Sequence, residues 1–274
     1  MIFPDYHIHS SFSEDCDTDI KDIILSAKSK GVSSICITDH YDMDFPILKE
    51  DPIIRFDLDI QSYINTLIAL KDNLSPDFDL RIGIELGTMP STLVKLTDFV
   101  KNNPYFDLII ASTHIVDNMD PYYPSFYEGR SIKDAYRRYF EDELYAVTNF
   151  DSYDVYGHLD YILRYGRDPK NPFEPKDFME IFEEIFKQII SKGKGIEINT
   201  GGLYKGLNNT HPCKEYLKLY KELGGEIITV GSDAHTTDKV GYGFDVAKDL
   251  LLDCGFNYYC TFKNRKATYN KIYV

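Results

Sequence analysis

Six of the seven histidines in this chain stand in short motifs that follow apolar runs, and these motifs suit metal binding. His7 and His9 lie in Asp-Tyr-His-Ile-His, His40 in Thr-Asp-His, and His114 in Ser-Thr-His. Because side chains alternate along a β-strand, both imidazoles of a His-x-His sequence point to the same side. Imidazole nitrogen is a common ligand of Zn²⁺ and Fe²⁺. The first motif therefore favours chelation of a divalent ion.

Further motifs add carboxylates to the imidazoles. His158 follows Val-Tyr-Gly, and Glu85 follows Arg-Ile-Gly-Ile. Asp233 and His235 share the motif Gly-Ser-Asp-Ala-His, and Asp15 stands just beyond the first motif. Each signal is weak alone, since one histidine after a strand is more often an ordinary polar residue. Taken together, the donors exceed the four that one tetrahedral ion needs. They predict two or three divalent ions, zinc, manganese or iron.

The elements that must position these residues alternate between short apolar strands and amphipathic helices. Strands are expected near residues 5–8, 33–37, 80–84, 108–111, 155–156, 195–198, 227–230 and 258–262. Helices are expected near 20–27, 60–68, 91–102, 132–147, 178–189, 213–223 and 243–254. The repeat favours a closed α/β barrel of about seven βα units, and an open doubly wound sheet is the alternative. In a barrel, all carboxyl ends of the strands open on one face, so the candidate ligands would meet there.

Composition narrows the class of protein. The 274 residues are 43% hydrophobic, which suits one barrel domain over 1–274. A formal charge of −14 argues against nucleic-acid and anionic-membrane partners. The five cysteines form no Cys-x-x-Cys pair, no apolar run reaches the ~18 residues of a membrane span, and the amino terminus lacks a signal-peptide pattern. We expect a cytoplasmic protein with reduced thiols and three long loops, at 41–58, 116–130 and 164–176.

The chain resembles the polymerase-and-histidinol-phosphatase (PHP) family. The motifs D-Y-H-I-H-S, I-T-D-H, G-I-E-L-G, A-S-T-H, G-H-L-D, E-I-N-T-G and G-S-D-A-H occur in family order over nearly the whole chain. The resemblance implies a distorted (β/α)7 barrel with a trinuclear metal site. The length of the chain and its segment G-H-L-D-Y-I-L-R-Y, followed by E-I-N-T-G-G-L, are most similar to those of the monofunctional histidinol-phosphate phosphatases. That branch implies a small phosphate ester, L-histidinol phosphate, as the substrate.

The resemblance also implies a ligand set for each of three metal ions. One ion would be held by His7, His9, Glu85 and Asp233. A second would be held by Glu85, His114 and His158, with Glu85 as the bridge. The third would be held by Asp15, His40 and His235, where some relatives have histidine in place of Asp15.

Two basic residues are implied to grip the phosphate. Arg164 follows the G-H-L-D motif, and Lys205 stands where the family pattern suggests arginine after E-I-N-T. Lysine supplies charge but not the bidentate fork of arginine. Our hypothesis for the reaction is in-line attack by a metal-bound hydroxide, without a covalent phosphoenzyme. The hydroxide would be held by Glu85, Asp233 and His235.

Other polar residues have weaker assignments. The cationic end of the substrate would meet long-loop residues such as Tyr122, Tyr123 and Glu128. Glu197, Asp39 and Asp160 are candidates to orient ligand imidazoles. His211, in Thr-His-Pro, is interpreted as part of a helix start rather than as a ligand.

Three other functions stay open on the sequence. The chain could be a PHP phosphoesterase for another small phosphate or a nucleotide. It could be an amidohydrolase-like metal hydrolase, although no lysine suited to carbamylation is evident and the Ser-Asp-Ala-His ending favours PHP. It could also be a noncatalytic, metal-stabilised PHP module, against which the intact ligand set argues.

Overall fold

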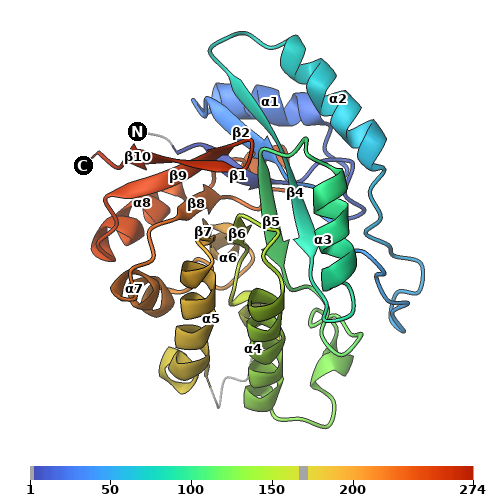
Figure 1. Cartoon of the computed structure of the whole chain (residues 1–274), viewed down its shortest axis with the longest axis vertical. Helices are drawn as coiled ribbons and strands as arrows, with labels where there is room; N and C mark the ends of the chain where they lie inside the picture. The colour runs from blue at the N-terminus through green and yellow to red at the C-terminus, as the bar shows by residue number, and fades with distance from the viewer. Residues whose placement is uncertain (1–2, 167–171, 274) are drawn as a thin grey trace.

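A barrel of parallel strands forms the centre of the molecule, and helices cover its outside (Figure 1). The computed structural model describes residues 3–166 and 172–273. The barrel strands run in chain order: β1 (Asp5–Ile8), β2 (Ser34–Ile37), β4 (Asp79–Gly87), β5 (Leu108–Ser112), β6 (Val155–Tyr156), β7 (Gly195–Asn199) and β8 (Ile228–Gly231). All of their pairings are parallel. This order is what successive βα units produce.

The first and last barrel strands meet and nearly close the ring. The backbone N–H of His9 donates to the Ala234 carbonyl at 2.9 Å, and the N–H of Asp233 donates to the His7 carbonyl at 2.8 Å. A parallel bridge joins Ile8 to Ala234. The closure is short and irregular, so the predicted distorted (β/α)7 barrel is confirmed and the open sheet is excluded.

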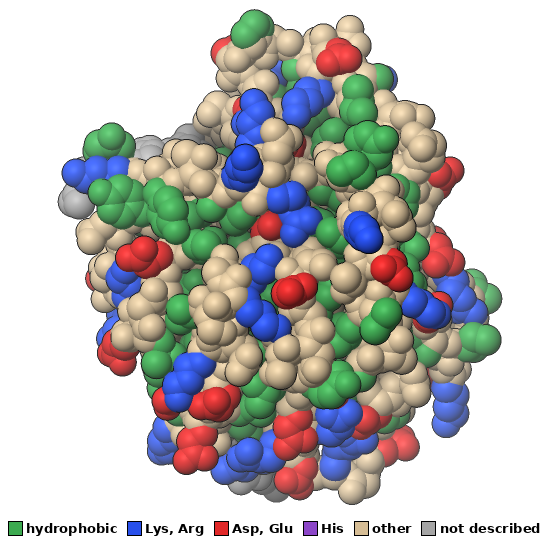
Figure 2. All heavy atoms as spheres, viewed as in Figure 1, with side chains coloured by type: hydrophobic (Ala, Val, Ile, Leu, Met, Phe, Trp, Pro, Cys, Tyr) green, Lys and Arg blue, Asp and Glu red, His purple; other side chains and the backbone are tan. Residues whose placement is uncertain are grey.

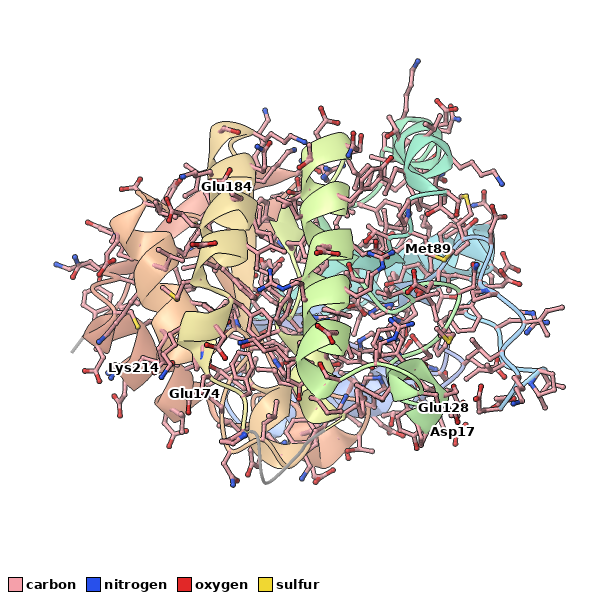
Figure 3. The ribbon with its side chains drawn as sticks, turned by 90° about the horizontal axis from the view of Figure 1, so that it is seen from below. Asp17, Met89, Glu128, Glu174, Glu184 and Lys214 are labelled. Atoms are coloured by element: carbon pink, nitrogen blue, oxygen red, sulfur yellow. The ribbon has the colours of Figure 1, made fainter. Side chains whose placement is uncertain are left out.

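The helices bury apolar stripes against the barrel, as their sequence periodicity predicts. They are α1 (Ile20–Ser29), α2 (Ile60–Asp72), α3 (Leu93–Asn102), α4 (Ile132–Asn149), α5 (Met179–Ser191), α6 (Gly201–Tyr204), α7 (Lys214–Glu222) and α8 (Phe244–Asp253). Short 3₁₀ turns cover Pro124–Tyr127, Tyr161–Arg164, Pro175–Asp177 and Thr237–Lys239. The α4 and α5 helices lie side by side in two views (Figures 1 and 3). Side chains of Asp19, Asp59 and Ser131 cap α1, α2 and α4.

A β-hairpin follows the barrel. The strand expected at 258–262 becomes β9 (Tyr258–Lys263), and it pairs antiparallel with β10 (Lys266–Lys271). Asn264 and Arg265 have φ of 49° and 63°, as a two-residue type I′ turn requires. The hairpin covers the amino-terminal end of the barrel, where the Tyr6 hydroxyl donates to the Phe262 carbonyl at 3.3 Å. Phe262 packs there in one apolar cluster with Tyr6, Cys36, Leu108, Ile110, Val155 and Cys260.

A short β3 (His40–Tyr41) pairs with β4 and starts the first long loop. Part of the third expected loop, residues 167–171, lies outside the described residues. On the face seen in Figure 2, basic and acidic side chains are interspersed. The five cysteines are buried and unpaired. Within residues 3–166 and 172–273, no helix combines the length and apolar character needed to cross a membrane.

Candidate metal centre

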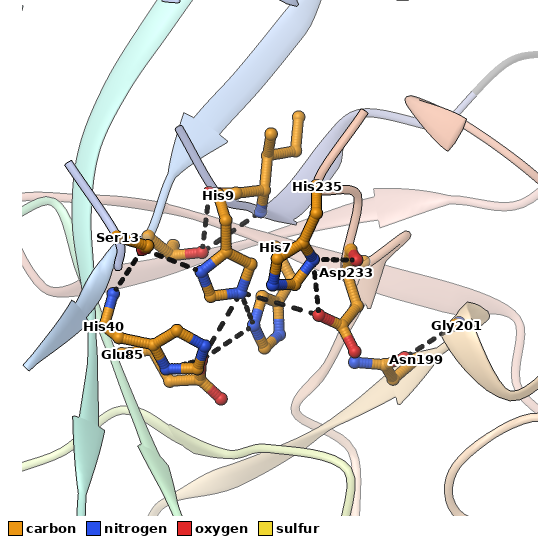
Figure 4. A network of polar contacts seen from close by, with 12 residues as sticks. His7, His9, Ser13, His40, Glu85, Asn199, Gly201, Asp233 and His235 are labelled. Atoms are coloured by element: carbon orange, nitrogen blue, oxygen red, sulfur yellow. Dashed lines mark hydrogen bonds and ion pairs between the residues drawn. The ribbon is translucent and has the colours of Figure 1, made fainter. Parts of the chain in front are cut away.

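The carboxyl ends of the barrel strands carry a dense cluster of imidazoles and carboxylates. Figure 4 shows His7, His9, His40 and His235 gathered around Glu85 and Asp233. These side chains come from β1, β3, β4 and the segment after β8. The cluster is buried or half-buried throughout and consists of His7, His9, His40, Glu85, His114, His158, Asp233 and His235. The strand order therefore brings together residues that are far apart in the chain.

The side chains expected around the first ion lie within a few ångströms of one another. The Nε2 atoms of His7 and His9 are 3.0 Å apart. They lie 3.2 Å and 3.4 Å from Oε2 of Glu85. Oδ1 of Asp233 is 3.5 Å from Nε2 of His9. One donor atom from each of His7, His9 and Glu85 lies within 4.8 Å of the other two, close enough for the three to share a metal ion.

Glu85 also faces the side chains expected around the second ion. Its Oε1 lies 2.8 Å from Nε2 of His158 and 3.3 Å from Nε2 of His114. Its Oε2 is directed toward the first group and lies 3.0 Å from Nδ1 of His40. One carboxylate thus spans both groups, which is the arrangement expected of a bridging ligand.

The third group is looser than the other two. Oδ2 of Asp15 lies 3.1 Å from Nε2 of His235 and 3.8 Å from Nε2 of His40. The Asp15 side chain is 37% exposed, whereas most of the cluster is buried. The tight histidine trio in this region is His9, His40 and His235. Asp15 therefore lies at the solvent edge of the cluster.

Hydrogen bonds outside the cluster turn several imidazoles inward. Nδ1 of His7 contacts Glu197 at 2.8 Å, and Nδ1 of His114 contacts Asp42 at 2.8 Å. Nδ1 of His9 contacts the Ser13 hydroxyl at 3.3 Å. Acceptors at Nδ1 fix the N–H there and leave the Nε2 lone pair for the centre of the cluster, as in most metal-bound histidines.

Several buried polar atoms of the cluster, and one of the adjoining Asp42, have no hydrogen-bond partner among the described residues. They are His40 Nδ1, Asp42 Oδ1, Glu85 Oε2, His114 Nε2 and His158 Nδ1. Buried polar atoms are normally satisfied, so such a concentration needs an explanation. Burial opposes ionisation of Glu85, yet the imidazoles of His7, His40 and His114 hold its pKa well below the usual range. An ionised carboxylate with one unpartnered oxygen among imidazole nitrogens suits a divalent cation.

Asp42 is a site residue that the sequence reasoning did not identify. It lies two positions after His40, and its side chain contacts Nδ1 of His114. A Cβ on Gly87 would stand 2.2 Å from the Asp42 carboxyl, so the carboxylate needs the glycine beside it. The His-x-Asp spacing along a short strand was the available signal, because alternation places both side chains on the same side.

The residues expected to orient ligand imidazoles differ in whether they contact the cluster directly. Glu197 contacts His7 directly, as expected. Asp39 accepts from the Ser13 hydroxyl at 2.7 Å and so reaches His9 through that hydroxyl. Asp160 contacts His211 rather than a cluster histidine. His211 is fully buried, so the interpretation as a simple helix-start residue was incomplete.

Two cations from later segments adjoin the cluster. Arg164 Nη2 donates to Oδ2 of Asp233 at 2.8 Å, and Lys205 Nζ lies 3.4 Å from the same oxygen. Although burial opposes it, Lys205 and Arg164 hold the pKa of Asp233 well below its usual range. A pocket beside the cluster is lined by Asp15, His40, Phe45, Phe56, His114, Asp120, His158, Tyr161, Arg164, Lys205, Asp233 and His235. Both basic residues therefore face the same hollow as the candidate ligands.

Together, the barrel and the donor cluster at the carboxyl ends of its strands define the class of metal-dependent hydrolase barrels. Within that class the chain belongs to the PHP family, since a model of the PHP domain matches residues 5–201.

Individual relatives agree along almost the whole chain. A histidinol-phosphatase of Lactococcus lactis is 31% identical and covers 97% of both chains. A probable histidinol-phosphatase of Clostridium acetobutylicum is 28% identical over 93% of this chain and 94% of its own. The crystal structure of the Lactococcus lactis histidinol phosphate phosphatase, complexed with zinc, L-histidinol and phosphate, superposes with a TM-score of 0.88 at 30% identity, covering 97% of this chain and 98% of the relative.

Proposed function

We propose that this protein is a metal-dependent phosphomonoesterase that hydrolyses L-histidinol phosphate to L-histidinol and phosphate. One observation carries the proposal: a cluster of metal-type donors shares a pocket with Arg164 and Lys205. The relative crystallised with zinc, L-histidinol and phosphate supports the choice of substrate. We treat residues 1–274 as one catalytic domain, because Asp233 and His235 follow the stretch matched to the PHP domain.

The ligand sets follow the three groups of the cluster. His7, His9, Glu85 and Asp233 would hold one ion, and Glu85, His114 and His158 a second. Asp15, His40 and His235 would hold a third, at the most exposed position. When bound, divalent ions activate water near neutral pH and neutralise charge on the phosphoryl oxygens. Zinc, manganese or iron suits these donors.

Arg164 and Lys205 would bind the phosphoryl group of the substrate. Both already contact Oδ2 of Asp233, so they stand next to the proposed metal ligands. The planar guanidinium can offer two parallel N–H donors to phosphate oxygens. Arg164 also stacks over Tyr161, with its central carbon 4.8 Å from the ring centroid, which limits its rotation. Lys205, in the segment that follows the neighbouring strand β7, adds positive charge.

The pocket also contains groups that suit the cationic end of histidinol phosphate. Asp120 lines the pocket, and burial raises the pKa of its carboxyl to about 6. Phe45, Phe56 and Tyr161 supply aromatic surface there. Tyr122 is 59% exposed. Tyr122, Tyr123 and Glu128 are absent from the described residues that line the pocket. We therefore move the proposed cation subsite from those residues to Asp120.

A substrate screen tests this proposal. Phosphate release from L-histidinol phosphate, p-nitrophenyl phosphate and a nucleoside monophosphate would be measured on the purified, metal-analysed protein. We expect kcat/KM to be about 10²-fold higher for L-histidinol phosphate, since a buried charge pair is worth roughly 3 kcal/mol. Preference for another ester would refute the substrate, and no phosphate release from any ester would refute the reaction.

Variants of the second long loop sharpen the same test. Asp120→Asn should raise KM for L-histidinol phosphate and leave p-nitrophenyl phosphate unaffected, because only the first substrate carries an ammonium. Asp117→Asn is the matched control, since Asp117 lies in the same loop but pairs with Arg138 at 2.9 Å. Equal effects of Asp120→Asn on both substrates would remove Asp120 from the recognition of the cationic end.

A further inference from the structure

Arg164 is held by a line of buried side chains that extends away from the metal cluster. Its Nε donates to Nε2 of His211 at 2.9 Å, while its Nη2 donates to Asp233. On the far side of the ring, Nδ1 of His211 contacts Oδ1 of Asp160. The second Asp160 oxygen accepts the backbone N–H of Cys213 at 2.8 Å. His211 and Asp160 are fully buried, so no solvent competes for these bonds.

The contacts determine which ring nitrogen of His211 carries the proton. An arginine guanidinium only donates, so Nε2 of His211 must offer its lone pair to Arg164. The proton then sits on Nδ1, where the Asp160 carboxylate accepts it. A carboxylate that fixes the tautomer and orientation of an imidazole is a common device in enzyme sites. In this protein, the oriented imidazole meets an arginine instead of a metal or a nucleophile.

The backbone around His211 is built to keep the imidazole in place. The N–H of His211 donates to the Asn199 carbonyl at 2.8 Å, and the N–H of Asn199 donates back at 2.7 Å. This pair attaches residue 211 to the end of β7. A Cβ on Gly202 would stand 3.1 Å from Nε2 of His211, and a Cβ on Gly201 would stand 3.0 Å from Nη2 of Arg164. The two glycines allow the α6 turn to pass close to both side chains.

We propose that His211, oriented by Asp160, is a positioning residue that fixes Arg164 for phosphate binding. With Nε bound to His211 and Nη2 bound to Asp233, the guanidinium plane is set by hydrogen bonds at two of its three nitrogens. A rigid fork loses less conformational entropy when it binds a phosphoryl group. This inference rests on the proposed function, in which Arg164 binds the phosphate.

The test compares His211→Phe with His211→Gln in the metal-loaded protein. Phenylalanine fills the ring volume but cannot accept from Arg164, whereas the glutamine oxygen can occupy the position of Nε2. We expect His211→Phe to weaken inorganic phosphate binding, measured by calorimetry, and to lower kcat/KM, each by about tenfold or more. His211→Gln should recover most of both losses. Unchanged phosphate binding in His211→Phe would overturn the proposal.

A double mutant separates positioning from a general effect on folding. If His211 acts through Arg164, His211→Phe should add little to the loss already caused by Arg164→Ala. Additive losses would overturn the proposal. Tyr220→Phe is the matched control, because it removes a hydrogen bond of 3.0 Å to the Ile227 carbonyl far from the pocket. It should leave phosphate binding unchanged, and calorimetry with inorganic phosphate gives a result even if the substrate proves to be another ester.

Discussion

The two ends of the barrel treat buried carboxylates in opposite ways. At the amino-terminal end, Asp107 accepts the N–H groups of Ile82 and Asn264, and Asp154 accepts from Arg265 and Ile109. At the carboxyl end, Oε2 of Glu85 is buried without a hydrogen-bond donor among the described residues.

The difference shows which end is complete and which requires an added partner. Protein donors neutralise the carboxylates beneath the barrel, so that end is self-sufficient. At the mouth, Oε2 of Glu85 faces the imidazole nitrogens of His7, His9 and His40, and a bound cation would supply the partner that this oxygen lacks.

The largest effect should come from the bridging carboxylate. We expect Glu85→Gln to lower kcat/KM by about 10³-fold or more and to reduce bound metal, because the amide lacks the charge that both ion groups need. Glu197→Gln is the matched comparison, since Glu197 reaches the cluster only through His7 and the His158 N–H. It should cost about 10- to 100-fold. Full metal content and activity in Glu85→Gln would contradict the assigned bridge.

Metal removal should destabilise the mouth without harming the other end. Ions bound at about a thousand times their Kd stabilise the folded state by roughly 4 kcal/mol, so chelation should lower the melting temperature by roughly 10 °C. Calorimetric melting before and after dialysis against a chelator measures this, and readdition of metal should restore the value. Identical melting curves with and without chelator would argue against a metal centre.

A substitution at the amino-terminal end of the barrel should lower stability and leave metal content and activity unchanged. Arg265→Ala leaves the Asp154 carboxylate without its cation, and we expect a loss of about 2 kcal/mol in the free energy of unfolding. Metal content and kcat/KM should stay at the level of the unaltered protein. Lys266→Ala, at an exposed neighbouring position of the hairpin, should change neither quantity. A selective loss of metal in Arg265→Ala would show that the two ends are coupled.

Glu143 gives a graded effect that is small for each pH unit. It is fully buried in α4, neither carboxyl oxygen has a hydrogen-bond partner among the described residues, and burial raises its pKa well above the usual range. The folded state therefore keeps its proton to higher pH than the unfolded state. Stability should fall by at most about 1.4 kcal/mol per pH unit, from the ordinary glutamate pKa up to the raised one.

Glu143→Gln removes this titration. Its stability gain over the unaltered protein should be near zero at pH 4 and should grow as the pH rises, as followed by urea unfolding at several pH values. A gain that does not depend on pH would show that Glu143 is not protonated in the folded state.

The sequence predicted the barrel because each strand is a buried apolar run and each helix has a clear stripe. It also predicted that histidines at strand ends would meet, since parallel strands share one mouth. It did not predict β10, whose sequence Lys-Ala-Thr-Tyr-Asn-Lys contains no run of large aliphatic residues, although Ala267 packs against the apolar cluster there. Asp42 was missed, and His211 was assigned only to a helix start, for another reason: their roles depend on contacts with residues distant in the chain, at His114 and Arg164.

The seam between β1 and β8 has a consequence for biosynthesis. His7 and His9 leave the ribosome before Asp233 and His235, because they precede them in the chain. Glu85, His114 and His158 come from the middle of the chain and can assemble on β4 to β6 beforehand. The proposed first ion group, which combines His7 with Asp233, is completed only when the backbone bonds of the seam form. Full loading of the proposed metal site would therefore follow translation of β8.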